Sequence, residues 1–322
     1  MARGRPTPAS QVNALNLPTF RTINVAVTIM RQEESAPIQH TCWPDTQALP
    51  LRENEKSEAL RFLAQRPLHT VYMASLIHDN GVESDLNRGR LYSYRSSHGH
   101  LEGIALLGHA TLIEARTESS LAAFARLAQQ SSLPYLIRGE EDLVKKFWGQ
   151  YEKSGQGASR VCRELLLEQV NAPRGPEIAG LRPATLADLE NVIKVNSEMA
   201  IAESGNDPLK RDPEGFRYRT ARRIERGRNW IWMEDGKLLF KADIIAETPQ
   251  VVYLEGIYVD PNERGKGYGS MGLSQLGRKL LQRAGSVCLT LNASKEKTKN
   301  FYGKAGFTLR SYYDTIYLQP AH

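Results

Sequence analysis

The sequence predicts an α+β protein in which one fold occurs twice in tandem. The chain has 322 residues, which is more than one typical domain and enough for two. Two prolines and two glycines within residues 170–180 are typical of a linker, which we place at 171–180. On both sides of it, predicted strands and helices follow in nearly the same order. Each copy is therefore expected to be a mixed, mostly antiparallel twisted sheet flanked by helices.

The C-terminal copy, predicted for residues 181–322, has the clearer pattern. Its elements follow in the order β-α-α-β-β-β-α-β-α-β-β. The pair Asp235-Gly236 separates two apolar alternating runs, which predicts a hairpin. Residues 251–259 are rich in β-branched and aromatic side chains and predict a strand. Residues 307–318 predict a closing pair of strands.

The N-terminal copy, predicted for residues 46–170, repeats most of this order but differs at one place. After the third strand of the C-terminal copy, residues 262–270 contain three glycines. At the matching place the N-terminal copy has residues 116–120, which contain none. Residues 1–45 show one short strand-like run and no clear periodicity. We expect them to be an N-terminal extension, either flexible or not needed by the folded protein.

Composition limits the classes of protein. Hydrophobic residues make up 41% of the chain, which is enough for buried cores. The net charge of +6 is spread along the chain, which favours solubility and local attraction for an anion over nucleic-acid binding. The three cysteines show no CxxC spacing, and no apolar run approaches a membrane span. The sequence therefore predicts a cytoplasmic protein with no membrane partner and no metal.

One glycine-rich turn carries chemistry. The motif Arg264-Gly-Lys-Gly-Tyr-Gly269 lies between a predicted strand and a predicted helix. Such a turn directs backbone N–H groups toward one point, and the helix start adds its positive dipole end. Glycine lets the main chain approach a phosphate closely. The motif therefore predicts a pyrophosphate cradle, although it matches neither the Walker loop nor the GxGxxG fingerprint.

The neighbours of this turn strengthen the interpretation. A β-rich run at 251–261 precedes it, and Asn300-Phe-Tyr-Gly-Lys-Ala-Gly-Phe307 follows it. Together the three elements resemble the GCN5-related N-acetyltransferase (GNAT) superfamily, whose signatures are Arg/Gln-x-x-Gly-x-Gly/Ala and a later Tyr-x-x-x-Gly-Phe. The motif Phe240-Lys-Ala-Asp243, with acidic-proline motifs at 207–209 and 212–216, also resembles a bacterial group. Its members join a degenerate N-terminal GNAT-like region to an active C-terminal GNAT domain.

The resemblance implies acetyl-CoA as co-substrate and a set of binding residues. In the superfamily, pantetheine pairs with the fourth strand where it separates from the fifth. The superfamily often has an asparagine before the last helix, where this chain has Lys295, with Asn292 as the nearby substitute. The implied cofactor-binding residues are Ile257, Tyr258, Val259, Arg264, Gly265, Lys266, Gly267, Tyr268, Gly269, Ser270, Asn292 and Lys295.

Two side chains are the catalytic candidates. The superfamily places a tyrosine hydroxyl near the sulfur, which makes Tyr302 the general acid, although a core tyrosine is the alternative. Glu255 is the candidate carboxylate, which would bind the acceptor ammonium or accept its proton. The period of two predicts that Glu255 shares a strand face with Ile257 and Val259. An exposed strand glutamate without a role is the alternative.

The expected function is transfer of an acetyl or short acyl group from CoA to a primary amine by direct attack. The acceptor is expected to be a small molecule or a peptide, and the protein a monomer or homodimer. One alternative is a CoA-binding sensor or scaffold without turnover. Another is an aminoacyl transferase that uses tRNA, which lacks support because no basic patch with interleaved aromatic residues is evident.

Overall fold

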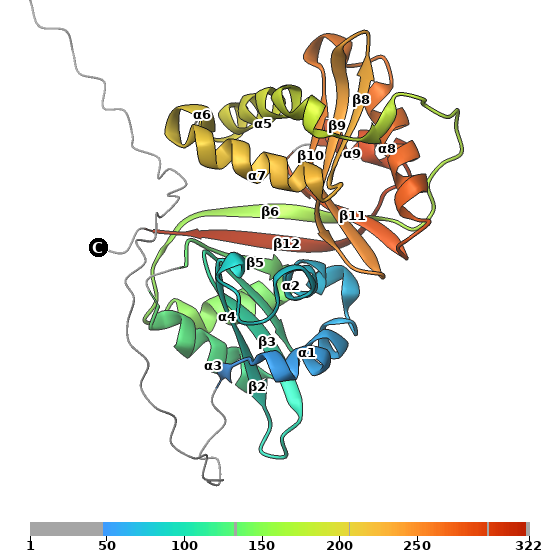
Figure 1. Cartoon of the computed structure of the whole chain (residues 1–322). Coiled ribbons are helices and arrows are strands. Elements are labelled where there is room, and N and C mark those ends of the chain that lie inside the picture. The colour runs from blue at the N-terminus through green and yellow to red at the C-terminus, as the bar shows by residue number, and fades with distance from the viewer. Residues whose placement is uncertain (1–47, 132–133, 206, 295, 320–322) are drawn as a thin grey trace, which may run out of the picture. The chain divides into compact units, whose positions relative to one another are not determined.

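A single mixed sheet runs through the described part of the chain (Figure 1). The computed structural model describes residues 48–131, 134–205, 207–294 and 296–319, all within the unit formed by residues 40–322. The predicted extension at 1–45 lies outside the described residues, as does Lys295. Below, the N-terminal half means residues 48–169, and the C-terminal half means the described residues from 181 onward.

The N-terminal half begins with a short edge strand and two helices and ends in a long strand. Its elements are β1 (Leu49–Pro50), α1 (Lys56–Leu63), α2 (Pro67–Asn80), β2 (Gly89–Arg95), β3 (Leu101–Gly108), β4 (Ala110–Ala115), α3 (Glu118–Gln129), β5 (Leu136–Glu140), α4 (Glu141–Tyr151) and β6 (Ala158–Gln169).

The C-terminal half repeats this order, with one additional short helix. Its elements are β7 (Leu181–Pro183), α5 (Leu189–Ser204), α6 (Pro208–Arg211), α7 (Pro213–Glu225), β8 (Asn229–Glu234), β9 (Lys237–Glu247), β10 (Val251–Val259), α8 (Tyr268–Leu280), β11 (Ser286–Asn292), α9 (Glu296–Lys304) and β12 (Thr308–Leu318). The predicted hairpin turn is confirmed, because Asp235 and Gly236 both have positive φ, as a type I′ turn requires.

The strands follow the order β1-β2-β3-β4-β5-β12-β6-β11-β10-β9-β8-β7. Read outward from its centre, the sheet shows the same succession of equivalent strands on both sides. The closing strands are exchanged, since β6 pairs with β11 of the C-terminal half and β12 pairs with β5 of the N-terminal half. At the centre β6 and β12 pair with each other. The predicted α+β fold with two like copies is therefore confirmed, whereas the domain boundaries stay a prediction.

The prediction of a closing pair of strands at 307–318 was wrong. The segment is one strand of 11 residues, β12, which pairs with β6 on one edge and β5 on the other. A register shift between Leu309 and Ser311 bends it without reversing it. No glycine or proline lies inside the segment to form a turn, and pairing on both edges favours a continuous strand.

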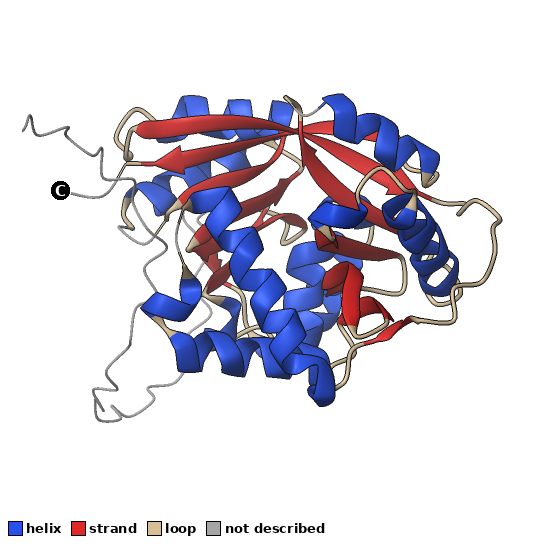
Figure 2. Cartoon of the chain, turned by 90° about the horizontal axis from the view of Figure 1, so that it is seen from above, coloured by secondary structure: helices blue, strands red, loops and turns tan. Residues whose placement is uncertain are grey.

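Helices cover both faces of the twisted sheet (Figure 2). Helix α2 packs on both halves at once. Met73, Ala74 and Ile77 join the core beneath α1, while Val71 packs with Tyr253 of β10 in the other half. This double burial explains why α2 is apolar on more than one side. No helix in the described residues is long and apolar enough to cross a membrane.

We predict that the two halves unfold together, because each contributes a central strand to the other. Phe124 of α3 is fully buried in the N-terminal core, so Phe124→Ala should cost about 3–5 kcal/mol. Scanning calorimetry should show one endotherm in both proteins, shifted as a whole to lower temperature in the variant. Two endotherms, of which only one moves, would show that the halves unfold independently.

Candidate active site

The candidate site begins where β10 and β11 separate. These parallel strands pair from Val251–Ser286 to Leu254–Leu289, and no further pair between them is found in the described residues. Beyond that point β10 stays paired only with β9, and β11 only with β6. Main-chain groups on the inner edge of residues 255–259 are therefore left without a strand partner, which suits an extended ligand that pairs like an added strand.

A β-bulge at Gly256 shapes this edge. Its φ is +60°, and the pairing with β9 shifts register between Glu255 and Tyr258. A Cβ at this position would lie 2.6 Å from Asp243 Oδ2 and 3.0 Å from Lys241 Nζ. Both the positive φ and the close approach therefore require glycine here.

The bulge makes one prediction about side-chain direction wrong. Ile257 and Val259 pack against the core beneath α8, whereas Glu255 meets Tyr253 on the opposite face. Tyr258 shares that opposite face and packs beneath α5 and α7. The extra residue of the bulge breaks the period of two, so Glu255 does not share a face with Ile257 and Val259.

A buried charge pair, which the sequence pattern alone did not reveal, lies directly behind the bulge. Lys241 is fully buried, and its Nζ is 2.6 Å from Asp243 Oδ2. Asn229 donates a hydrogen bond of 2.6 Å to the other oxygen of Asp243. Removing one partner of such a pair leaves an uncompensated buried charge, which costs several kcal/mol. The available signal was the spacing of two charges, two residues apart in a strand and hence on one face.

The glycines of the turn at 264–269 serve different purposes. Gly265 and Gly267 have φ values of +83° and +93°, which other residues rarely adopt. A Cβ on Gly269 would lie 2.7 Å from Phe301 and 2.8 Å from Val259, so this glycine permits close packing of α8. Helix α8 follows Gly267 without a side-chain cap, which leaves its first N–H groups available to an anion.

The charged and polar side chains of the turn lie at the surface. Lys266 pairs with Glu263 at 2.7 Å, and Arg264 donates from Nε to the carbonyl of Val259 at 3.3 Å. Ser270 donates to the carbonyl of Gly267 at 3.0 Å. The two cations therefore lie beside the uncapped helix start, where they add to its attraction for a phosphate.

The matching turn of the N-terminal half is built differently. Thr117 caps α3 by accepting a hydrogen bond from the N–H of Ser120 at 3.2 Å. Glu114 of β4, the strand before this turn, is 1% exposed and forms ion pairs with Arg66 and Arg116. Burial raises the pKa of Glu114, although both arginines act in the opposite direction. The helix start after β4 is therefore capped, and the carboxylate of Glu114 is buried and paired.

Tyr302 lies in the core of the C-terminal half. It is 8% exposed, and its ring contacts Phe301 and Phe307 with centroid distances of 4.9 and 6.0 Å. Burial raises the pKa of Tyr302 to about 12. The phenol is therefore protonated at neutral pH, as a proton donor must be, and the packing also fits a core role.

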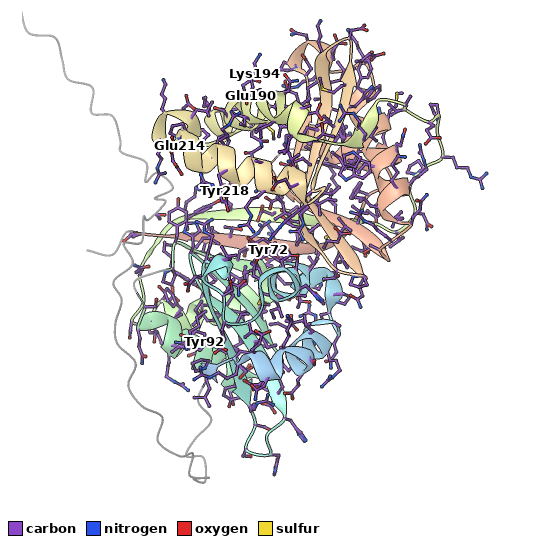
Figure 3. The ribbon with its side chains drawn as sticks, viewed as in Figure 1. Tyr72, Tyr92, Glu190, Lys194, Glu214 and Tyr218 are labelled. Atoms are coloured by element: carbon purple, nitrogen blue, oxygen red, sulfur yellow. The ribbon has the colours of Figure 1, made fainter. Side chains whose placement is uncertain are left out.

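Glu255 is open to solvent on the face that carries α2, α5 and α7. Its side chain is 45% exposed, and its Oε1 accepts a hydrogen bond of 2.7 Å from the hydroxyl of Tyr253. Two exposed tyrosines project from helices of this face, Tyr72 from α2 and Tyr218 from α7 (Figure 3). Tyr72 is nevertheless partly desolvated by its surroundings, which raises its pKa, and the charge of Glu255 adds to this shift.

Asn292 ends β11 and is exposed. Its Oδ1 accepts hydrogen bonds from the N–H and the hydroxyl of Ser294, at 3.0 and 2.7 Å. Asn292 therefore stabilises the turn after β11 through its side-chain oxygen. Among the described residues, no cluster of three or more histidine, cysteine or acidic side chains is arranged to hold a metal.

Residues 196–307 match the model of the acetyltransferase (GNAT) family. These residues form a GNAT domain. The match covers the separating strands, the glycine turn and Tyr302. A search of curated proteins finds no match to the sequence.

Solved structures support the fold of the GNAT domain and its repeat. A GNAT-family acetyltransferase from Colwellia psychrerythraea has a TM-score of 0.53 and 12% identity, over 85% of this chain and all of its own. A tandem GNAT protein from the clavulanic acid biosynthesis pathway has a TM-score of 0.53 and 14% identity, over 86% of this chain and all of its own. A GCN5-related N-acetyltransferase from Sphaerobacter thermophilus has a TM-score of 0.53 and 13% identity, over 85% of this chain and 95% of its own. At these identities the likeness concerns the fold.

We predict that Gly256→Ala destabilises the GNAT domain by about 1–3 kcal/mol, because alanine meets both a positive φ and the Asp243 carboxylate. Gly227→Ala is the matched control, since Gly227 has a φ of +65° but no atom near the Cβ position. Denaturant unfolding should show the smaller loss for the control. Equal losses would mean that the Asp243 contact imposes no constraint.

Proposed function

We propose that this protein is an N-acetyltransferase that transfers an acetyl or short acyl group from CoA to a primary amine. A GNAT fold supports acyl-CoA-dependent acetyl transfer in general. The specific proposal rests on the position of three features around the gap that opens where β10 and β11 stop pairing. The uncapped start of α8, the unpaired edge of β10 and the exposed Glu255 all border the separation of β10 from β11.

The cofactor roles follow from these features. The N–H groups at the start of α8, with Arg264 and Lys266, would hold the pyrophosphate of CoA. The main chain of 257–259 would pair with pantetheine, and Asn292 would bond it from the end of β11. We propose residues 181–322 as the catalytic domain and residues 46–170 as a degenerate copy, because the turn after β4 has no glycine and the helix start that follows it is capped.

The proposed reaction is direct attack of the acceptor amine on the acyl-CoA thioester. The amine nitrogen attacks the thioester carbonyl carbon, so that a C–N bond forms and the C–S bond breaks. Main-chain N–H groups on the β10 edge would stabilise the oxyanion. Glu255 would accept the ammonium proton, directly or through water, and Tyr302 would protonate the departing thiolate. The enzyme itself forms no covalent intermediate.

A thiol-release assay with acetyl-CoA tests the function directly. The acceptor panel should include polyamines, amino acids, aminoglycosides and short peptides. Release of CoA thiol that depends on an amine supports the enzyme. Firm CoA binding without turnover on any amine would instead favour the alternative, a CoA-binding sensor.

We predict that Gly267→Glu weakens CoA binding by at least about a hundredfold. The side chain would enter the phosphate space, and its charge would repel the diphosphate. Gly267→Ala is the control, because it shares the strained φ of +93° but adds neither length nor charge. Calorimetric titration with CoA measures both. An unchanged Kd in a folded Gly267→Glu protein would place the pyrophosphate elsewhere.

We predict that Tyr302→Phe lowers kcat by roughly ten- to a thousandfold at saturating acetyl-CoA, the scale for losing a general acid. Since the pKa of Tyr302 is about 12, the phenol is protonated at all pH values up to about 10. The loss should therefore be the same from pH 7 to 10. Tyr151→Phe, which removes a buried phenol from the N-terminal half, should leave kcat unchanged. Wild-type turnover in Tyr302→Phe would leave water as the proton donor.

A further inference from the structure

A line of polar side chains crosses the centre of the sheet from one half to the other. It begins on β5 of the N-terminal half and ends on β10, beside the gap described above. Its members are Arg138 on β5, Thr315 on β12, Glu164 on β6, Thr290 on β11, and Tyr253 and Glu255 on β10. The line therefore links the degenerate copy to the face on which Glu255 is exposed.

Arg138 makes the contacts that join the two halves. Its Nη2 donates to the hydroxyl of Tyr253 at 3.1 Å and to Oγ1 of Thr290 at 2.5 Å. Its Nε lies 3.1 Å from Oε2 of Glu164, which also accepts a hydrogen bond of 2.7 Å from Thr315. The planar guanidinium suits this arrangement, because its donors point in fixed directions toward several acceptors at once.

Tyr253 links Arg138 to Glu255 through hydrogen bonds to both side chains. The residue is 6% exposed, and burial raises the pKa of its phenol well above the ordinary value, so the phenol stays protonated and can donate. It donates to Oε1 of Glu255 at 2.7 Å, and Nη1 of Arg138 lies 3.7 Å from the same oxygen. Both contacts reach one oxygen of a half-exposed carboxylate, so the carboxylate is held in position while it remains accessible to an acceptor.

The charges of the cluster do not balance. Arg138 contributes one positive charge, and Glu164 and Glu255 contribute one negative charge each. The surplus negative charge lies at the exposed member, Glu255. A cationic group that arrives from solvent would therefore complete the cluster, and a protonated primary amine is such a group.

We propose that Arg138 is a positioning residue for the acceptor amine. It holds Glu255, mainly through Tyr253, in the orientation in which the carboxylate binds the acceptor ammonium. The degenerate N-terminal half thus contributes to acceptor binding although it lacks a cofactor cradle. This inference rests on the role that the proposed function gives to Glu255, and it names a cationic primary amine as the acceptor class.

The test is a double-mutant cycle on R138Q and E255Q, with the best amine of the panel as acceptor and acetyl-CoA at saturation. R138Q should raise the KM for the amine about tenfold, change kcat less, and leave the Kd for CoA unchanged. The double variant should be no worse than E255Q alone, because Arg138 acts through Glu255. Additive losses would overturn the proposal, since a purely structural role would add to the loss of Glu255.

Two further variants distinguish a loss of acceptor binding from a loss of stability: R66Q is the matched control, and Tyr253→Phe is the milder change. R66Q also removes an arginine that contacts two carboxylates, Glu114 and Glu140, on the same face of the N-terminal half. It should lower the Tm and leave the KM unchanged. Tyr253→Phe cuts the link to Glu255 but keeps Arg138 paired with Glu164, so it should raise the KM about three- to tenfold. Wild-type KM in both R138Q and Tyr253→Phe would overturn the proposal.

The outcomes separate this inference from the proposed function. Wild-type kinetics for E255Q would remove Glu255 from the proposed mechanism, and Arg138 with it. A raised KM for E255Q with wild-type KM for R138Q would overturn the role of Arg138 alone. If no amine turns over, calorimetric titration with spermidine in the presence of CoA replaces kinetics. The same order of Kd values is then expected, and absence of spermidine binding by the wild type would overturn both.

Discussion

The pairing of β6 with β12 at the centre of the sheet is the constraint on which the rest of this structure depends. It joins two copies of one fold into a continuous sheet, and it places each closing strand beside the penultimate strand of the other copy. Helix α2 of the first copy consequently covers β10 of the second, and side chains from β5 come within reach of β10. The candidate active site is therefore built by one copy and bordered by the other.

Within the C-terminal half, the bulge at Gly256 converts an ordinary strand into one edge of a binding site. The buried pair Lys241–Asp243 occupies the space that a side chain at this position would need. The bulge turns Ile257 and Val259 into the core and leaves Glu255 on the open face. Core packing on one side and an accessible carboxylate on the other are thus compatible in a single strand.

The sequence could predict what depends on local patterns. Strand β10 has the predicted bounds, and the glycine turn lies between a strand and a helix as expected, because periodicity and turn chemistry act over a few residues. The direction of Glu255 was predicted wrongly, since a bulge depends on tertiary contacts such as the one with Asp243. Arg138 and the exchange of β6 and β12 could not be found, because both join residues more than a hundred positions apart.

The exchange of closing strands also bears on how such a chain is divided. A cut within 170–180 would separate two fragments, each of which lacks the neighbour for one of its own strands: β5 without β12, and β11 without β6. Each fragment would also carry a long strand, β6 or β12, that pairs with a strand of the other fragment. In topology the two halves resemble the subunits of a heterodimer that exchange strands. The linker joins them in one polypeptide and so sets their effective concentration. The two halves are therefore interdependent, like the fragments in split-protein complementation, and are not two independent domains in sequence.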